Sequence, residues 1–179
     1  MDRIKLHDKH FKLFIPNEKI EAAIRQTAGR INNDFRGCTE PPVFLSVLNG
    51  SFMFTASLMK YIDFQCELSF VKLSSYCGTA STGQVKQLIG VSDSLRSRRV
   101  IIVEDIVDSG KTITEMYAML KDMGVEDIRV CTLFLKPAAY KGSVSIDYHA
   151  MEIGNEFIVG FGLDYDQLGR QYPDIYIVD

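Results

Sequence analysis

The segment at residues 100–123 constrains the fold more than any other part of this chain. Residues 100–107 form an apolar run rich in β-branched side chains, and a turn leads into residues 112–123. There, Ile113, Met116 and Leu120 recur at helical spacing, and Gly124 can end the helix in a left-handed conformation. A strand that is apolar on both faces is typical of a parallel sheet covered by helices. The segment therefore predicts a strand–turn–helix unit of an α/β domain.

Similar strand and helix patterns alternate along the rest of the chain. The predicted strands span residues 43–48, 68–73, 85–91, 128–135 and 157–163, and the predicted helices span residues 17–37 and 51–62. Asn17 follows a proline and is the predicted N-cap of the first helix. A polar, glycine-containing stretch at residues 74–83 predicts a loop between two of the strands. The 179 residues fit one domain with a mainly parallel sheet, because compact domains usually contain about 100–200 residues.

Composition excludes several classes of partner. The chain has 20 Lys and Arg residues against 23 Asp and Glu residues, a balance that disfavours extended binding to nucleic acid or to an anionic membrane. No apolar run approaches the roughly 18 residues of a membrane span, and the N-terminal residues do not resemble a secretory signal, so we expect a cytoplasmic protein. The four cysteines lack the spacing of a zinc site or a disulfide framework.

Three acids and a polar turn mark the end of the strand at residues 100–107. Glu104, Asp105 and Asp108 lie where ligands bind in open α/β sheets, at the carboxyl end of a strand. The turn consists of Ser109, Gly110, Lys111 and Thr112. Its backbone N–H groups and the helix N-terminus can hold a phosphate, and clustered acids call for a divalent cation, sugar hydroxyls or a proton. A nucleotide-binding P-loop is excluded, because its motif requires glycine where this chain has Asp105.

This segment resembles the phosphoribosyl-diphosphate signature of type I phosphoribosyltransferases. Further matches follow in the same order at Leu48, Asn49, Gly50, Ser75, Tyr76, Lys136, Phe157, Ile158, Val159, Gly160, Leu163, Asp164, Tyr165 and Arg170. Together they are similar to the hypoxanthine-guanine phosphoribosyltransferase family. The resemblance implies one domain over residues 1–179, with a parallel-sheet core at about 36–148 and a small hood formed from about 1–35 and 149–179.

The resemblance also implies roles for the residues of the sugar and diphosphate side. It implies that Glu104 and Asp105 hold the ribose hydroxyls beside a magnesium ion, and that residues 109–112 bind the 5-phosphate. Asp164 resembles the family's second metal carboxylate, and Arg170 its pyrophosphate contact. Other substrate contacts are expected from the turn at Leu48, Asn49 and Gly50 and from a lid that carries Ser75 and Tyr76. Asn49 departs from the lysine that many family members have there.

On the base side, the resemblance implies that Asp108 is the general base for the purine N7 proton and that Lys136 recognises the 6-oxo group. Phe157 is expected to stack on the purine, while Ile158 offers backbone groups to its edge. The implied reaction joins hypoxanthine or guanine to phosphoribosyl diphosphate and gives IMP or GMP plus pyrophosphate, in a homodimer or homotetramer. Two alternatives stay open: a transferase that prefers xanthine, and a non-catalytic nucleotide-sensing regulator on the same fold.

Overall fold

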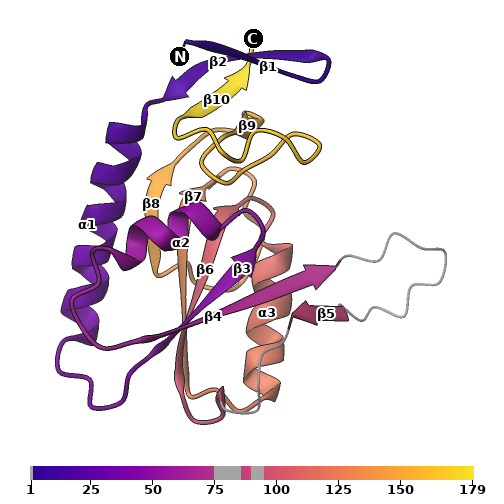
Figure 1. Ribbon diagram of the computed structural model, residues 1–179. Helices are drawn as coiled ribbons and strands as arrows, with labels where there is room; N and C mark the ends of the chain where they lie inside the picture. Colours follow the sequence, from indigo (N-terminus) through magenta and orange to yellow (C-terminus); the bar gives the residue numbers. More distant parts are fainter. Residues whose placement is uncertain (1, 75–85, 90–94) are drawn as a thin grey trace.

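A computed structural model describes residues 2–74, 86–89 and 95–179. In this part of the chain the larger sheet has the strand order β5-β4-β3-β6-β7-β8 (Figure 1). Its strands are β3 (Val43–Leu48), β4 (Glu67–Ser74), β5 (Lys86–Ile89), β6 (Arg99–Val107), β7 (Asp127–Leu135) and β8 (Tyr148–Glu152). All neighbouring pairs are parallel except β4 and β5, which are antiparallel. The mainly parallel sheet predicted from the sequence is therefore confirmed.

Helices cover both faces of this sheet. The helices are α1 (Asn17–Phe35), α2 (Phe52–Met59) and α3 (Lys111–Asp122). Side chains alternate along each strand: Phe44 and Ile101 pack in the cluster that contains α1 and α2, whereas Val43 and Ile102 pack in the cluster that contains α3. Because both faces are buried, the strands are continuous apolar runs rather than alternating ones.

A second, antiparallel sheet forms a hood at the carboxyl edge of the larger sheet. It has the order β1-β2-β10-β9, from β1 (Arg3–Leu6), β2 (Lys9–Ile15), β9 (Ile158–Val159) and β10 (Ile175–Val178). Figure 1 shows it at the top, beyond the ends of β6, β7 and β8, with both termini. From the N-terminal segment only β1 and β2 enter this sheet, because α1 lies against α2 and β8.

Two local predictions are wrong. Pro16, not Asn17, is the N-cap of α1; the Asn17 amide instead donates to Asp174 Oδ1 at 2.8 Å, which ties the helix to the C-terminal segment. The strand predicted at residues 157–163 contains only Ile158–Val159, because Gly160 and Gly162 have φ angles of 102° and 100° and turn the chain.

The other predicted ends that fall on described residues lie within three residues of the observed ones, whereas residues 85, 90 and 91 of the strand predicted at 85–91 lie outside the described residues. Gly124 follows α3 at a φ of 78°, as predicted for a residue that ends a helix.

No helix among the described residues is long and apolar enough to cross a membrane.

Candidate active site

Two adjacent carboxylates end the central strand β6 at the edge that faces the hood. Glu104 is only 7% exposed; its Oε1 accepts a hydrogen bond from the Asp105 amide at 3.3 Å, and its Oε2 has no partner among the described residues. Burial raises the pKa of Glu104 well above its usual range, and the neighbouring charge of Asp105 adds to this. Burial also raises the pKa of the half-buried Asp105. The pair is therefore poised to accept a cation or hydroxyl donors.

The turn between β3 and α2 lies directly against Asp105. A Cβ at Gly50 would be 1.5 Å from Asp105 Oδ2, so no other residue fits there without moving the carboxylate. A Cβ at Gly162, in the C-terminal segment, would be 2.1 Å from the Gly50 carbonyl oxygen. Leu48–Asn49 is a cis peptide bond, and Asn49 is exposed. The predicted Leu48-Asn49-Gly50 element is thus brought to the carboxylates and to the C-terminal segment.

A lysine and an aspartate from neighbouring strand ends form a close pair. Lys136 Nζ lies 3.2 Å from Asp108 Oδ2, and the lysine side chain is 9% exposed against 54% for the aspartate. The Lys136 amide donates to the Val107 carbonyl at 3.0 Å, which fixes the end of β7 beside the end of β6. The pair therefore presents a buried donor and an exposed acceptor side by side.

The predicted phosphate turn leads from β6 into α3. Gly110 caps α3 with a φ of 84°, a conformation that strongly favours glycine. Its carbonyl accepts hydrogen bonds from the Thr114 amide and from Thr114 Oγ1, both at 2.9 Å. Ser109, Lys111 and Thr112 are exposed. At such a helix N-terminus the helix dipole favours an anion.

The C-terminal segment contributes an aromatic ring and an ion pair. Phe157 is 50% exposed, and its ring meets the edge of the Tyr165 ring at 5.9 Å between centroids. Arg170 Nη2 lies 2.5 Å from Asp164 Oδ1, and Arg170 Nη1 donates to the Gly162 carbonyl at 2.8 Å. The sequence assigned Asp164 and Arg170 to different groups, but the structure pairs them directly. Ile158 is buried in β9.

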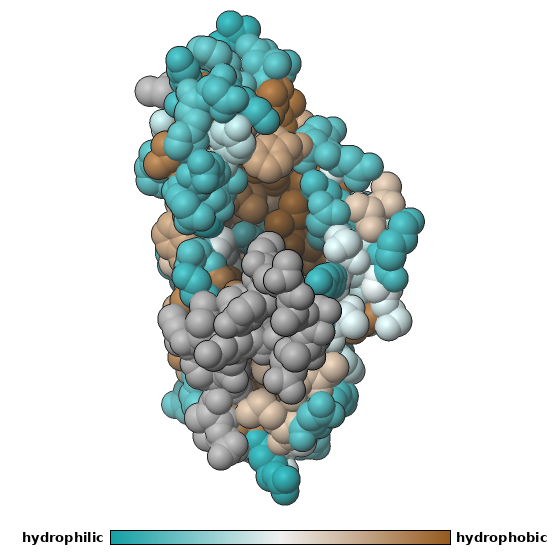
Figure 2. Space-filling view, turned by 90° about the vertical axis from the view of Figure 1, so that its right-hand side faces the viewer, coloured by the Kyte–Doolittle hydropathy of each residue, from teal (hydrophilic) through white to brown (hydrophobic). Residues whose placement is uncertain are grey.

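The surface is hollowed where these elements meet. Figure 2 shows a depression below the upper part of the molecule, with hydrophobic residues on its floor. An apolar floor beside a few convergent polar groups is typical of a small-molecule site. Ser75 and Tyr76 of the predicted lid lie outside the described residues.

Comparison with known proteins identifies the family and the fold. Residues 14–166 match the family model described as a phosphoribosyl transferase domain. The chain belongs to the phosphoribosyltransferase family. The resemblance stated from the sequence is therefore confirmed.

Similar proteins within this phosphoribosyltransferase family carry related names. The chain is 37% identical over 168 residues to the hypoxanthine-guanine phosphoribosyltransferase of Streptococcus mutans, covering 93% of this chain and 92% of the relative. It is 34% identical over 169 residues to the hypoxanthine phosphoribosyltransferase of Buchnera aphidicola, covering 93% and 96%. A solved structure of Trypanosoma cruzi hypoxanthine phosphoribosyl transferase superposes with a TM-score of 0.87 at 32% identity, covering 98% of this chain and 95% of that one.

The carboxylates of this phosphoribosyltransferase offer ligands suited to magnesium. Glu104 and Asp105 supply oxygen atoms alone, and the partnerless Glu104 Oε2 is a buried acceptor that a hard cation or its water shell could satisfy. The described residues contain no group of three or more acidic, cysteine or histidine side chains close enough to hold a metal. Asp164 instead accepts from the Gln167 amide at 2.8 Å in addition to its arginine partner. Magnesium is commonly held by one or two carboxylates together with phosphate oxygens of a substrate, and Glu104 and Asp105 would supply those carboxylates.

Some site neighbours were not assigned a role from the sequence. Tyr165 was matched to the family pattern, yet its contact with Phe157 depends on how the segment after β9 turns. Gly162 reaches the Gly50 carbonyl, and Tyr140 reaches the phosphate turn. Paired glycines after a short strand are the one signal that could have pointed to Gly162; nothing in the sequence marks Tyr140.

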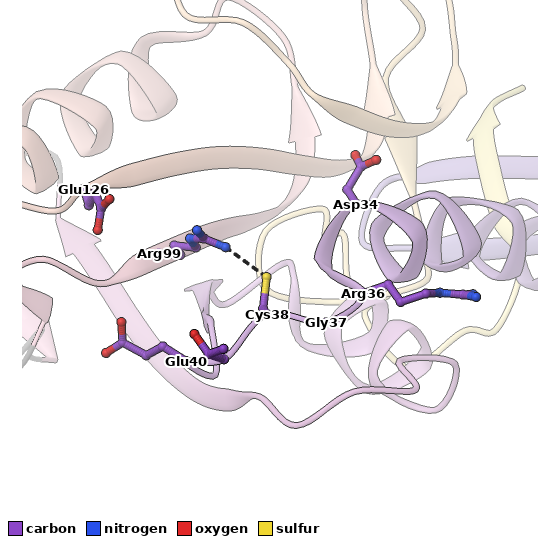
Figure 3. Close-up of a pocket in the computed structure, with 8 residues that line it drawn as sticks. Asp34, Arg36, Gly37, Cys38, Glu40, Arg99 and Glu126 are labelled. Atoms are coloured by element: carbon purple, nitrogen blue, oxygen red, sulfur yellow. Dashed lines mark hydrogen bonds between the residues drawn. The ribbon is translucent and has the colours of Figure 1, made fainter.

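A separate pocket of about 390 Å³ lies at the opposite, amino edge of the sheet (Figure 3). It is lined by Asp34, Arg36, Gly37, Cys38, Thr39, Glu40, Arg99 and Glu126. Arg99 Nη1 lies 2.9 Å from Cys38 Sγ, and Arg36 points away from this contact. None of these residues belongs to the predicted site.

Proposed function

We propose that this protein is a hypoxanthine-guanine phosphoribosyltransferase of purine salvage. It transfers the 5-phosphoribosyl group of phosphoribosyl diphosphate to N9 of hypoxanthine or guanine, giving IMP or GMP plus pyrophosphate. The observation that carries the proposal is the Lys136–Asp108 pair, in which a buried ammonium and an exposed carboxylate lie 3.2 Å apart at the carboxyl edge of the sheet. The names of the similar proteins support the same assignment.

This pair matches one edge of a 6-oxopurine. The ring carries O6 and N7 as neighbouring atoms on the same edge. Lys136 donates to O6, while Asp108 accepts the proton from N7 as the N9 lone pair attacks the sugar C1. A 6-amino group faces the ammonium with donors of its own, so adenine is disfavoured. Phe157, half exposed beside the site, stacks on the base.

On the sugar side, the new N9–C1 bond forms while the bond from C1 to the diphosphate oxygen breaks, and pyrophosphate leaves with that electron pair. Glu104 and Asp105 accept from the ribose hydroxyls, and the amides at residues 109–112 bind the 5-phosphate. The Gly50 turn and Arg170 orient the diphosphate. Glu104 and Asp105 would hold magnesium, which would supply positive charge to stabilise the leaving group.

Further expectations belong to the same proposal. The enzyme depends on magnesium, acts in the cytoplasm and forms a homodimer or homotetramer, for which sedimentation velocity is the direct measurement. The lid that carries Ser75 and Tyr76 shields the reacting carbon from water. Relatives named for hypoxanthine and guanine favour these bases over xanthine, and the retained Asp108 favours an enzyme over a nucleotide-sensing regulator.

Assays with a panel of bases test the proposal. Purified protein is incubated with phosphoribosyl diphosphate and hypoxanthine, guanine, xanthine or adenine, with magnesium or with EDTA, and nucleotide and pyrophosphate are quantified. We expect kcat/KM for hypoxanthine or guanine to exceed that for adenine by roughly 100-fold or more, because a mispaired buried donor is strongly unfavourable. A preference for xanthine or adenine would contradict the base assignment. Absence of pyrophosphate with every base would favour the regulator.

A further inference from the structure

A tyrosine from the segment after β7 packs on the phosphate turn. A Cβ at Gly110 would lie 2.3 Å from Tyr140 Cε2, and a Cβ at Gly142 would lie 2.8 Å from Tyr140 Cζ. The ring is therefore in close contact with the backbone of both glycines. Its position fills the space that any side chain at residue 110 would need.

Two hydrogen bonds hold Tyr140 within its own segment, and a third ties the next residue to the phosphate turn. The Tyr140 hydroxyl donates to the Val144 carbonyl, and burial raises the pKa of this hydroxyl, so it remains a donor at neutral pH. The Tyr140 amide donates to the Lys136 carbonyl at 3.0 Å, and the Lys141 amide donates to the Ser109 carbonyl at 3.3 Å. The ring thus has a fixed place relative to both Lys136 and the phosphate turn.

This contact restricts the backbone of Gly110, whose left-handed conformation sets the direction of the chain through the phosphate turn. The Gly110 carbonyl is held by Thr114 through two hydrogen bonds of 2.9 Å, and its α-carbon faces the tyrosine ring. Glycine without such contacts samples many backbone conformations. With the carbonyl and the α-carbon both restrained, the amides of the turn are ordered before an anion arrives, which reduces the entropy lost on binding.

We propose that Tyr140 is a positioning residue for the 5-phosphate of the substrate, acting through Gly110. The inference rests on the proposed function for the identity of that phosphate. It assigns to Tyr140 no contact with the base, with pyrophosphate or with the reacting carbon. Loss of the ring therefore weakens binding of ligands that carry a 5-phosphate and leaves other ligands unaffected.

Two variants and two ligands test this role by calorimetry. Y140A removes the ring, and G142A displaces it, because the added Cβ would lie 2.6 Å from the tyrosine hydroxyl oxygen. We expect both to weaken ribose 5-phosphate binding about tenfold, the scale of one poorly placed hydrogen bond to a charged group. Pyrophosphate binding should stay within about twofold of the unmodified protein. Y117A is the matched control, since Tyr117 is a partly buried tyrosine of the same hydrophobic cluster.

Y140F keeps the ring and loses only the donor to Val144, so it should recover most of the ribose 5-phosphate affinity. In steady-state assays Y140A should raise the KM for phosphoribosyl diphosphate, with kcat and the KM for hypoxanthine little changed. Equal weakening of both ligands, a similar loss in Y117A, or no ribose 5-phosphate binding by the unmodified protein would overturn the role. If the unmodified protein binds ribose 5-phosphate but makes no nucleotide, the proposed function fails, while the binding measurements still decide the role of Tyr140.

Discussion

Carboxylates in two parts of this molecule lie in opposite electrostatic settings. At the carboxyl edge, burial raises the pKa of both Glu104 and Asp105, and Glu104 Oε2 lacks a partner among the described residues. Between α1 and α2, burial would raise the pKa of Glu21 as well, but hydrogen bonds from Ser57 at 2.7 Å and Tyr61 at 3.0 Å outweigh it and lower that pKa. Both carboxylate oxygens of Glu21, which joins two helices, accept hydrogen bonds. Where a ligand is expected, one oxygen of Glu104 has no donor among the described residues.

Two cations differ in the number of their partners. Lys136 at the carboxyl edge has one ion-pair partner among the described residues, Asp108 at 3.2 Å. Arg98 at the amino edge has three partners: it donates to the Pro41 carbonyl at 2.8 Å and to Glu67 at 2.9 Å, and its Nε, which has no hydrogen-bond partner among the described residues, lies 3.1 Å from Glu40 in an ion pair. Substitutions at the carboxyl edge should therefore change activity, whereas those at the paired groups should change stability.

The largest effect is expected at Asp108. Asparagine keeps the shape of the side chain but cannot accept the N7 proton, so D108N should lower kcat by about 10²–10⁴-fold. Because Asp108 is 54% exposed, the midpoint of thermal unfolding should change little. Steady-state kinetics and circular-dichroism melting measure the two effects, with D122N at the exposed end of α3 as the control. Unchanged turnover would contradict the general-base role.

Arg98 should show the opposite pattern. R98A leaves the Pro41 carbonyl and the Glu67 carboxylate without their donor and removes the ion pair with Glu40, and we expect a loss of about 2 kcal/mol in the free energy of unfolding. Urea denaturation measures this loss, and kcat/KM should stay within about twofold, because the residue lies at the edge away from the site. R96A removes an exposed charge nearby and serves as the control. A loss of activity without a loss of stability would contradict the assignment of stability to the amino edge and activity to the carboxyl edge.

Glu104 should separate stability from function in one variant. In E104Q the buried charge is replaced by an amide that can donate to Asp105, so the free energy of unfolding should rise by about 1 kcal/mol. For a chain of this size that corresponds to a rise of about 2–4 °C in the unfolding midpoint. Affinity for phosphoribosyl diphosphate should fall about tenfold. Calorimetry of unfolding and of binding would test both, with E126Q as the exposed control, and a lower unfolding midpoint would refute the argument.

The sequence predicted the larger sheet better than the hood, and the reason is the range of the interactions. Strand β6 and helix α3 depend on a local apolar run and on Gly124, so their ends were predicted to within a residue. The pairing of β2 with β10 brings Ile15 beside Ile175 from the other end of the chain. No local pattern indicates that partner, and the hood was expected only from the family resemblance.

The candidate site divides in the same way. Asp108 and Lys136 end neighbouring parallel strands, so their proximity follows from strand order together with their positions in the sequence. The Arg170–Asp164 pair and the Tyr140 contact with Gly110 depend on the paths of irregular segments. The conformation of an irregular segment depends on packing throughout the domain, and this packing cannot be inferred from one sequence.

The smallest effect concerns Glu21 and depends on pH. Its pKa in the folded protein is lowered from the ordinary value of 4.5, so the charged form stabilises the fold above that pH. At pH 7, E21Q should therefore lose about 1 kcal/mol in the free energy of unfolding, since the amide accepts weaker hydrogen bonds from Ser57 and Tyr61. Urea denaturation from pH 7 to pH 3 measures the difference.

As the pH falls from 4.5 through the lowered pKa, Glu21 of the unmodified protein takes up a proton and its advantage over E21Q should disappear. E18Q, in the exposed first turn of α1, controls for the loss of a helix carboxylate. A difference between E21Q and the unmodified protein that persists unchanged at pH 3 would mean that packing, not charge, holds α1 to α2. Glu21 and Glu104 would then differ only in how deeply they are buried, because the charge of Glu21 would not stabilise the fold.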